Sequence, residues 1–408
     1  MKALLIGLNY APEPSGNAPY TSKLAQGLAD RGVQVNVITG YPHYPEWKIA
    51  EGYEGLSMDE RHGAVTVKRL RSTVPKHPNG LGRLLMEVTF GARTVLQRWP
   101  RPDVVLVVSP ALFSAAFAIF RARLFRIPVG IWVQDLYSKG MEETSDGRSS
   151  LAPLMKRLEA LILRAADGVS VIHDRFREHV VHELGVPGDR VRVIRNWTHV
   201  NHHPSFDRSS ARDRLGWAPE DFIALHAGNM GVKQGLENVI DAAHLASRNG
   251  SDVRFVLLGN GNQRGFLESK ASGADRLQFL EPLPDRAYSE ALRSADVLLV
   301  NERPGVKDMS VPSKLTSYFV TGRPIVAATE TGSATSHEMS AAGAGLRVDP
   351  GVPEDLVAAI EQLQEDPGSA EDFGAAARQY SEKVLSEEAA VQSYAAWLSD
   401  LAFRANSN

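Results

Sequence analysis

Short apolar runs alternate with helical segments along most of the chain, and this alternation limits the possible folds more than any other feature. Runs such as ALLIGL (3–8), DVVLVVS (103–109) and FIALHAG (222–228) have the length and composition of strands buried on both faces. An amphipathic segment near 20–31 has the spacing of a helix. Strands that alternate with helices form parallel sheets covered on both faces. The sequence therefore predicts an α/β protein with doubly wound, Rossmann-like parallel sheets.

The length of the chain predicts two domains, because 408 residues exceed the usual size of a single hydrophobic core. The alternation weakens across a polar stretch at 199–221, and we place the interdomain linker near 198–212. We expect one Rossmann-like domain at 1–200, a second at 201–380, and a C-terminal helix at 381–408 that packs back on the first domain.

Composition argues against several classes of function. The formal net charge of −3 is unlike that of nucleic-acid-binding proteins, which concentrate basic residues on one face. The absence of cysteine excludes disulfides, thiolate catalysis and cysteine-bound metals, and it is typical of a reducing cytoplasm. No apolar run approaches the ~20 residues of a membrane-spanning helix, and the apolar N-terminal run predicts a strand rather than a signal peptide. HExxH and GxSxG motifs are both missing. We expect a cytoplasmic protein that binds neither a metal nor nucleic acid.

The segment PSKLTSYFVTGRPIVAAT (312–329) predicts an anion-binding helix start that is followed by a buried strand. Pro312 and Ser313 suit a helix N-terminus, where free backbone N–H groups attract anions, and Lys314 adds a full charge. Gly322 and the proline after it are expected to end the helix. This pattern favours a phosphate-bearing ligand.

A second candidate phosphate site follows the first strand of the second domain. In HAGNMGVKQGLENVIDAA (226–243), Gly228, Gly231 and Gly235 surround Lys233, so a glycine loop presents a cation at a helix start. A diphosphate site needs this combination, although a solvated lysine in a glycine-rich turn has the same sequence. The spacing departs from the Walker pattern GxxxxGK[ST].

Two loops of the first domain are further candidates. The loop at 9–20 is rich in glycine and proline, and Gly16 would let the backbone approach a ligand; the alternative is an ordinary strand-to-helix connection. Asp135 ends an apolar strand in VQDLYSKG (133–140). Its carboxylate is suited to orient an acceptor hydroxyl as a general base, or simply to cap the next segment.

Aromatic residues and histidines give weaker indications. The loop TGYPHYPEWK (39–48) contains aromatic rings and His43, which suit a sugar or lipid-linked acceptor as well as a proline-stiffened surface loop. His173 in VIHDRF is expected to be structural, as is usual for a lone histidine near a strand end.

Two apolar segments with interspersed arginines, at 81–99 and 113–128, have helical spacing. Such helices suit the surface of an anionic membrane, or they simply cover the sheet. We expect these helices to cover the sheet, with peripheral membrane contact through 81–126 as the alternative.

Taken together, these motifs are similar to those of glycosyltransferase family 4, whose two Rossmann-like domains face each other across a cleft in the architecture called GT-B. The resemblance covers nearly the whole chain and is strongest to colanic-acid-type and fucosamine-type bacterial polysaccharide transferases. It rests on the loop at 9–20, TGYPHYP, VQD, GNMGVKQGLE and PSKLT…GRP. Asn196 in VIRNW and the turn GNGNQR (259–264) also match the family.

The resemblance implies retaining transfer of a sugar from a nucleotide-sugar donor, with UDP as the favoured nucleotide and without an essential metal. The implied catalytic residues are Asp135, Lys233 and Asn229. The implied donor-binding residues are Gly16, Gly228, Gly231, Lys233, Gly259, Leu283, Ser313, Lys314 and Leu315. Lys233, Lys314 and the amides of 313–315 would stabilise the departing diphosphate, the loop at 280–283 would hold the base, and domain closure would exclude water.

The chain departs from the family at a pair of glutamates. Many members carry a Glu-x7-Glu pair whose positions fall at Met309 and Ser317 here, while Asp308 and Glu302 lie out of register. Asn229 replaces an arginine that many members have. The contacts to the donor sugar and to the ribose therefore do not carry over from the family.

The predicted function is transfer of a sugar to a lipid-linked saccharide at the cytoplasmic face of the membrane, in bacterial polysaccharide biosynthesis. Three alternatives remain at this stage. The first is a soluble glycosyltransferase that acts on a small-molecule natural product, and the second is a nucleotide-sugar-binding protein that is impaired in catalysis. The third is an epimerase of the same fold that acts on a UDP-sugar.

Overall fold

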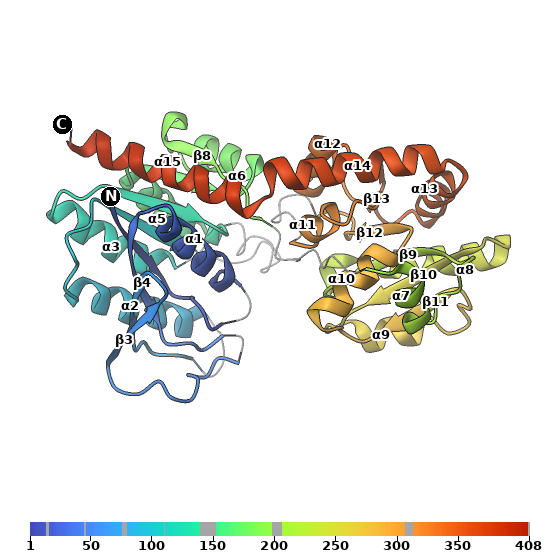
Figure 1. The fold of residues 1–408 in the computed structure, drawn as a ribbon, viewed down its shortest axis with the longest axis horizontal. Coiled ribbons are helices and arrows are strands. Elements are labelled where there is room, and N and C mark those ends of the chain that lie inside the picture. Colours follow the sequence, from blue (N-terminus) through green and yellow to red (C-terminus); the bar gives the residue numbers. More distant parts are fainter. Residues whose placement is uncertain are drawn as a thin grey trace. The chain divides into compact units, whose positions relative to one another are not determined.

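The computed structural model divides into two compact units, one formed by residues 1–196 and 387–408 and the other by residues 197–386 (Figure 1). The structure describes residues 1–13, 16–44, 46–75, 80–109, 111–138, 152–197, 206–306 and 313–406. The sequence predicted divisions at 200 and 380.

The first unit contains an eight-stranded sheet in the order β3-β4-β2-β1-β5-β6-β7-β8. Its strands are β1 (Lys2–Gly7), β2 (Gln34–Gly40), β3 (Ser57–His62), β4 (Val65–Leu70), β5 (Val104–Ser109), β6 (Val129–Val133), β7 (Gly168–Val171) and β8 (Val191–Val193). All neighbours are parallel except β3, which runs antiparallel to β4. The central strands are buried on both faces, as their continuous apolar sequences predict.

Helices cover both faces of this sheet. They are α1 (Ala18–Asp30), α2 (Gly80–Leu96), α3 (Leu112–Leu124), α5 (Ala152–Ala165), α6 (Asp174–Glu178) and α15 (Glu387–Asn406). Side chains of α2, α3 and α5 share one core with alternate residues of β1, β5 and β6. Helices α1 and α15 contact each other, and α15 packs on β5 and β6. In the described part of the chain, no helix is both long and apolar enough to cross a membrane.

The pair β3–β4 was not predicted from the sequence. Its outer strand, SMDERH, has no fully buried residue, and the inner strand alternates buried with exposed positions up to its last two residues. An edge hairpin of this kind lacks the continuous apolar run that marks the parallel strands.

The second unit contains a six-stranded, fully parallel sheet in the order β11-β10-β9-β12-β13-β14. Its strands are β9 (Phe222–Ala227), β10 (Val253–Leu258), β11 (Leu277–Leu280), β12 (Val297–Asn301), β13 (Ile325–Ala328) and β14 (Gly345–Val348). The strand order reverses between β9 and β12, and such a switch point is where ligands of open parallel sheets bind. The prediction of doubly wound parallel sheets is confirmed.

Two separate cores lie on the two faces of this sheet. One is shared with α7 (Arg208–Leu215), α10 (Asp285–Ser294), α11 (Ser313–Phe319), α12 (Ala334–Ala342) and α14 (Pro367–Val384). The other is shared with α8 (Glu237–Asn249), α9 (Arg264–Lys270) and α13 (Pro353–Glu365).

The predicted linker and tail differ from the structure in detail. Residues 198–205 lie outside the described part of the chain, but the second half of the predicted linker is wrong because α7 begins at Arg208. Asp207 caps this helix by accepting the backbone N–H groups of Ser209 and Ser210. The segment near 381–405 is not one helix, since α14 ends at Val384 and α15 begins at Glu387.

Candidate active site

The loops after β9 and β10 lie backbone against backbone, and glycines make this approach possible. The Gly228 N–H donates to the Leu258 carbonyl at 2.8 Å. A Cβ added to Gly259 would lie 2.0 Å from the Gly228 oxygen, and one added to Gly261 would lie 2.4 Å from the Met230 oxygen. Any side chain at Gly259 or Gly261 would therefore force the two loops apart.

Lys314 on α11 lies beside this glycine loop. A Cβ on Gly228 would lie 3.7 Å from its Cε, and its Nζ lies 3.3 Å from Nε2 of His226 at the end of β9. Burial lowers the pKa of His226 well below its ordinary value, so a neutral ring faces the lysine. Burial also lowers the pKa of Lys314 to about 8, and the charge of Glu302 acts against this effect. Lys314 makes no salt bridge within the described residues.

Glu302 belongs to this site, although sequence reasoning set it aside as out of register. It follows β12 directly, and its Oε1 accepts a hydrogen bond from Thr335 Oγ1 at 2.5 Å while Oε2 accepts one from Thr329. Burial raises the pKa of Glu302 in spite of these hydrogen bonds. An acidic residue at the end of a buried strand was the indication available in the sequence.

The loop that carries Lys233 is anchored through its backbone. Asn301, the last residue of β12, donates from Nδ2 to the carbonyls of Gln234 and Gly235, both at 2.8 Å. The Lys233 carbonyl accepts the N–H of Arg303 at 2.9 Å. The Lys233 side chain itself is exposed. The fold therefore holds the loop firmly while the lysine faces solvent.

Asn229 and Gly231 occupy the outer part of the same loop. Asn229 is exposed, and a Cβ on Gly231 would lie 2.9 Å from its Nδ2. A Cβ on Gly261 would lie 2.7 Å from Asn229 Oδ1. The amide of Asn229 thus lies between two glycines, at the surface of the loop pair.

The turn after β10 is fixed by an arginine. Arg264 donates from Nη1 to the Gly259 carbonyl at 2.7 Å and to the Leu280 carbonyl at 3.3 Å, and it forms a salt bridge with Glu281 at 2.8 Å. Leu283 is half-buried against the core. The predicted base-holding loop at 280–283 therefore lies next to Gly259.

The predicted helix start is described from Ser313 onward. Ser313 is the first residue of α11, while Pro312, Met309 and Asp308 lie outside the described part of the chain. The Leu315 side chain is fully buried in the core, so only its backbone amide is available to a ligand. The helix ends at Phe319, and Gly322 has a positive φ of 67° in the turn that precedes β13.

In the first unit, a buried glutamate joins the loops after β1 and β2. Glu13 is 5% exposed and accepts the backbone N–H groups of His43 at 2.8 Å and Tyr44 at 3.0 Å. His43 is buried, with Nδ1 2.8 Å from the Tyr41 carbonyl. Gly16 has a positive φ of 65°, and a Cβ there would lie 3.6 Å from the Tyr44 ring. Sequence reasoning identified the loop but not Glu13.

Asp135 stands at the carboxyl end of β6, where two buried glutamates hold the segment that follows it. Asp135 is exposed and accepts the N–H of Leu136 at 2.9 Å. Glu159 accepts the backbone N–H groups of Tyr137 at 2.7 Å and Ser138 at 3.1 Å. Glu87 on α2 accepts the Tyr137 hydroxyl at 3.0 Å.

Glu87 also accepts the N–H of Phe113 at the start of α3, at 2.9 Å. Burial raises the pKa of Glu87 to about 7, against the lowering effect of its hydrogen bonds and of Arg83. His173 caps α6 by accepting the Phe176 N–H on Nδ1 at 3.3 Å, and burial lowers its pKa to about 4. Among the described residues, no group of three or more His, Asp or Glu side chains is arranged to hold a metal ion.

Comparison with known proteins gives two family matches. Residues 15–197 match the family described as "Glycosyl transferase 4-like domain", and residues 207–380 match "Glycosyl transferases group 1". The chain is 32% identical over 381 residues to the "Putative colanic acid biosynthesis glycosyl transferase WcaI" of Escherichia coli K12, which covers 89% of this chain and 92% of that protein. It is 24% identical to the "2-deoxystreptamine glucosyltransferase" of Streptomyces kanamyceticus, over 74% of this chain and 80% of that protein.

Solved structures share the fold at low sequence identity. Sucrose-phosphate synthase from Thermosynechococcus elongatus matches with a TM-score of 0.72 at 18% identity, over 99% of this chain and all of that chain. Anabaena HepE in complex with UDP-glucose matches with a TM-score of 0.67 at 18% identity, over 98% of this chain and 100% of that chain.

Proposed function

Because the chain belongs to glycosyltransferase family 4, we propose that it transfers a sugar from a UDP-sugar to a lipid-linked saccharide, with retention of anomeric configuration. It is a glycosyltransferase of GT-B fold, and its long match to WcaI supports a role in polysaccharide biosynthesis. The identity of the donor, the stereochemistry and the acceptor are the parts of this statement that experiments must test.

Lys314 is the observation that carries the donor part of the proposal. Lys314 is half-buried, and burial disfavours its charged form. An anionic ligand relieves that cost, since no salt bridge does so among the described residues. The lysine lies at the carboxyl edge of the sheet beside Gly228, where a diphosphate can approach the backbone closely. HepE, which shares the fold, binds UDP-glucose, and this supports UDP as the nucleotide.

The remaining roles follow from where the side chains lie. We assign Lys233 and the glycines of its loop to the diphosphate, and Leu283 with Gly259 to the base. Asn229 faces the same loop surface and is assigned to the developing charge on the leaving group. In the first unit, Asp135 is assigned to the acceptor hydroxyl and Gly16 to the donor sugar. Ser313 and the Leu315 amide complete the donor site.

The donor assignment is tested by binding and by turnover. Purified protein is screened with UDP-, GDP- and dTDP-sugars by thermal shift and by mass spectrometry of the products, and NMR of the product reports the anomeric configuration. Lys314→Met should weaken UDP binding by about tenfold or more, because it removes a charge-assisted contact while keeping the apolar stem. Lys270→Met is the matched control, since Lys270 is already paired with Asp241 at 2.8 Å. The proposal fails if no nucleotide sugar binds.

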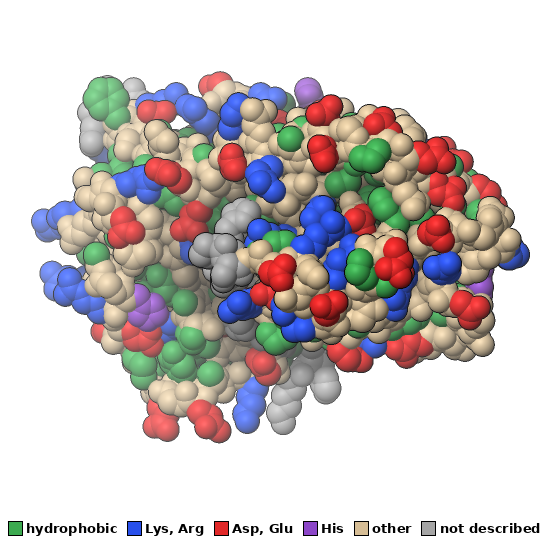
Figure 2. Space-filling view, turned by 45° about the vertical axis from the view of Figure 1, so that its right-hand side comes forward, with side chains coloured by type: hydrophobic (Ala, Val, Ile, Leu, Met, Phe, Trp, Pro, Cys, Tyr) green, Lys and Arg blue, Asp and Glu red, His purple; other side chains and the backbone are tan. Residues whose placement is uncertain are grey.

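The lipid-linked acceptor is supported by the helix layer α2, α3 and α5. Among the described residues of these helices, the two acidic side chains, Glu87 and Glu159, are buried, so the exposed charges are all basic. Exposed large apolar side chains accompany them: Leu81, Leu85, Leu96, Phe120, Leu124, Leu154 and Leu161. By contrast, acidic side chains gather over α13 and α14 of the second unit (Figure 2). A surface that is both basic and apolar suits an anionic membrane.

Vesicle flotation tests this contact. Wild-type protein should float with vesicles that contain phosphatidylglycerol and less with phosphatidylcholine alone. The double variant Leu81→Ser/Leu85→Ser should lose flotation, because both side chains are more than half exposed and their apolar surface is removed. Phe266→Ser is the control, since Phe266 is 53% exposed on α9 in the other unit. Equal flotation with both vesicle types would count against the membrane contact.

The second candidate function is glycosylation of a small-molecule natural product. It is favoured by the similarity to 2-deoxystreptamine glucosyltransferase, which extends over 74% of this chain. Transfer to a water-soluble aminocyclitol without vesicle binding would support this candidate and exclude the lipid-linked one.

A further inference from the structure

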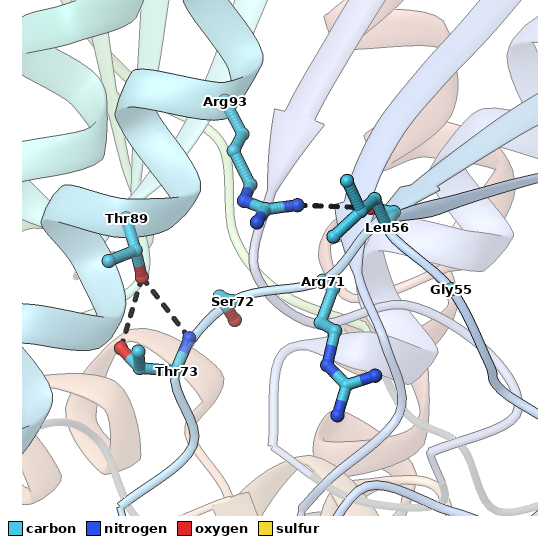
Figure 3. Close-up of a pocket in the computed structure, with 7 residues that line it drawn as sticks. All are labelled: Gly55, Leu56, Arg71, Ser72, Thr73, Thr89 and Arg93. Carbon is cyan, nitrogen blue, oxygen red and sulfur yellow. Dashed lines mark hydrogen bonds between the residues drawn. The ribbon is translucent and has the colours of Figure 1, made fainter.

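A pocket of about 330 Å³ lies in the first unit, where β4 ends beside α2. Leu56, Arg71, Ser72, Thr73, Thr89 and Arg93 line it. Thr73 and Thr89 lie on one side and Leu56 and Arg71 on the other, while Arg93 reaches from α2 toward the Leu56 carbonyl (Figure 3). Residues from three separate stretches of the sequence thus form one concave site that the proposed donor and acceptor roles do not use.

The pocket is cationic. Arg71 is exposed and forms no salt bridge, and Arg93 donates only to the Leu56 carbonyl, at 3.3 Å, in the part of the chain that the structure describes. No described acidic side chain lines the pocket. Burial raises the pKa of Tyr41, and the two arginines are near enough to act against this effect. Glu60 also acts on Tyr41, so one carboxylate lies near the two arginines, but it does not line the pocket.

Hydroxyl groups supply further polar contacts. Ser72 is only 8% exposed, and its hydroxyl makes no hydrogen bond with any described residue. Thr89 Oγ1 accepts the N–H of Thr73 at 3.2 Å, which fixes the wall next to Ser72. The Ser72 hydroxyl is not sealed from solvent, so it can hydrogen-bond to a ligand that enters the pocket. Guanidinium groups with a nearby hydroxyl match the several acceptor oxygens of a phosphate.

The pocket is larger and more apolar than a site for free phosphate. A water molecule occupies about 30 Å³ in the liquid, and a phosphate is only a few times larger, so room remains for an attached group. Leu56 lines the pocket and is 67% exposed, and Leu85, one turn before Thr89 on α2, is 53% exposed. An apolar chain leaving the pocket would find these side chains at its edge.

We propose that this pocket binds a phosphate group attached to an apolar chain, such as a phospholipid headgroup or the diphosphate of a lipid-linked saccharide. This binding site is additional to the proposed transfer reaction. It rests on the proposed function only if the bound phosphate belongs to the acceptor.

Binding of dodecyl phosphate below its micelle concentration tests the site directly. Wild type should bind it about tenfold or more tightly than Arg71→Gln or Arg93→Gln, because each variant loses a charge-assisted hydrogen bond. Arg61→Gln, at an arginine of β3 that does not line the pocket, should match wild type. Inorganic phosphate and dodecyl maltoside should both bind more weakly than dodecyl phosphate. Equal affinity of wild type and both pocket variants would overturn the proposal, and so would equal binding of inorganic phosphate.

Two further measurements distinguish the source of the phosphate. If it is a headgroup, Arg71→Gln weakens binding to vesicles that contain phosphatidic acid and leaves transfer to a detergent-dispersed acceptor unchanged. If it belongs to the acceptor, Arg71→Gln raises KM for a lipid-diphosphate acceptor and leaves vesicle binding unchanged.

UDP binding should be unaffected in both cases, because the assigned donor contacts of Lys314 lie in the second unit. A wild-type protein without transferase activity would refute the proposed function and leave the dodecyl phosphate result standing. If Arg93→Gln fails to fold, Arg71→Gln alone still tests the proposal, because the exposed Arg71 side chain can be replaced without loss of the fold.

Discussion

At the residue scale, Lys314 links the fold to the proposed chemistry. Its ammonium group lies beside a neutral imidazole and forms no salt bridge with a described residue, and burial holds its pKa at about 8. A diphosphate would supply the missing negative charge, and its binding would in turn favour the protonated lysine.

UDP affinity should therefore fall as the pH rises through about 8. Above pH 7 the diphosphate is fully ionised, so the change reports loss of the proton from Lys314, with a slope of up to about tenfold per pH unit. Lys314→Arg keeps its charge at every pH and should show a flat profile over this range. Calorimetric titration at several pH values measures this, and parallel profiles for the two proteins would contradict the assignment.

Glu87 determines a second pH dependence, this time of stability. Its pKa is about 7 in the folded protein and 4.5 ordinarily, so the folded state holds its proton more tightly than the unfolded state. The resulting stabilisation is fully present below pH 4.5 and is lost as the pH rises through about 7. It amounts to about 3 kcal/mol at most.

Glu87→Gln, which resembles the protonated form, should remove this contribution. Urea unfolding from about pH 5 to about pH 8 compares the two proteins, and the difference between their free energies of unfolding isolates Glu87 from His173. His173 has the opposite sign, because its lowered pKa of about 4 makes the folded state less stable as the pH falls below 6.5. A constant difference between wild type and variant across this range would show that Glu87 keeps an ordinary pKa.

At the element scale, α15 completes the core of the first unit although it comes last in the sequence. Gly130 of β6 and Gly168 of β7 are paired neighbours, and a Cβ at either would lie 2.8 or 3.0 Å from the ring of Trp397. Two adjacent glycines thus form a flat surface on which the indole packs. Trp397 is 4% exposed.

Trp397→Ala should destabilise the first unit by about 3–5 kcal/mol, because it leaves a cavity over the two glycines. Phe403→Ala on the same helix is the matched control, since Phe403 is 73% exposed and its loss should change stability by less than about 0.5 kcal/mol. Denaturant unfolding followed by tryptophan fluorescence and circular dichroism measures both. Similar losses for the two variants would mean that α15 does not pack as described.

At the scale of the whole molecule, the chain contains two units, each with its own cores. Differential scanning calorimetry should show two transitions. UDP should raise the midpoint of only the transition of residues 197–386. At a UDP concentration of about 100 times Kd, the free energy of unfolding of this unit should rise by about 2.7 kcal/mol. A single transition that UDP shifts as a whole would show instead that the units unfold together.

Many elements of this protein follow from the sequence, because their causes are local. Continuous apolar runs become buried parallel strands such as β5 and β13, and glycines at 228 and 259 mark where loops approach each other. The spacing of these elements, together with the motifs they carry, was enough to identify the family. The β3–β4 hairpin was not predicted because β3 has no buried residue and neither strand is a continuous apolar run.

Tertiary structure decided which polar residues are buried and what they contact. Glu87 meets the Phe113 N–H and the Tyr137 hydroxyl, and Glu302 meets Thr329 and Thr335, through contacts between distant parts of the chain. Burial then sets the pKa values of both glutamates, and no local pattern records burial of this kind. The same holds for the arginine pocket, whose walls come from three separate segments. The sequence by itself determined most of the parallel strands, the glycine loops and the family, because these depend on neighbours along the chain. The electrostatics of the sites depend on neighbours in space.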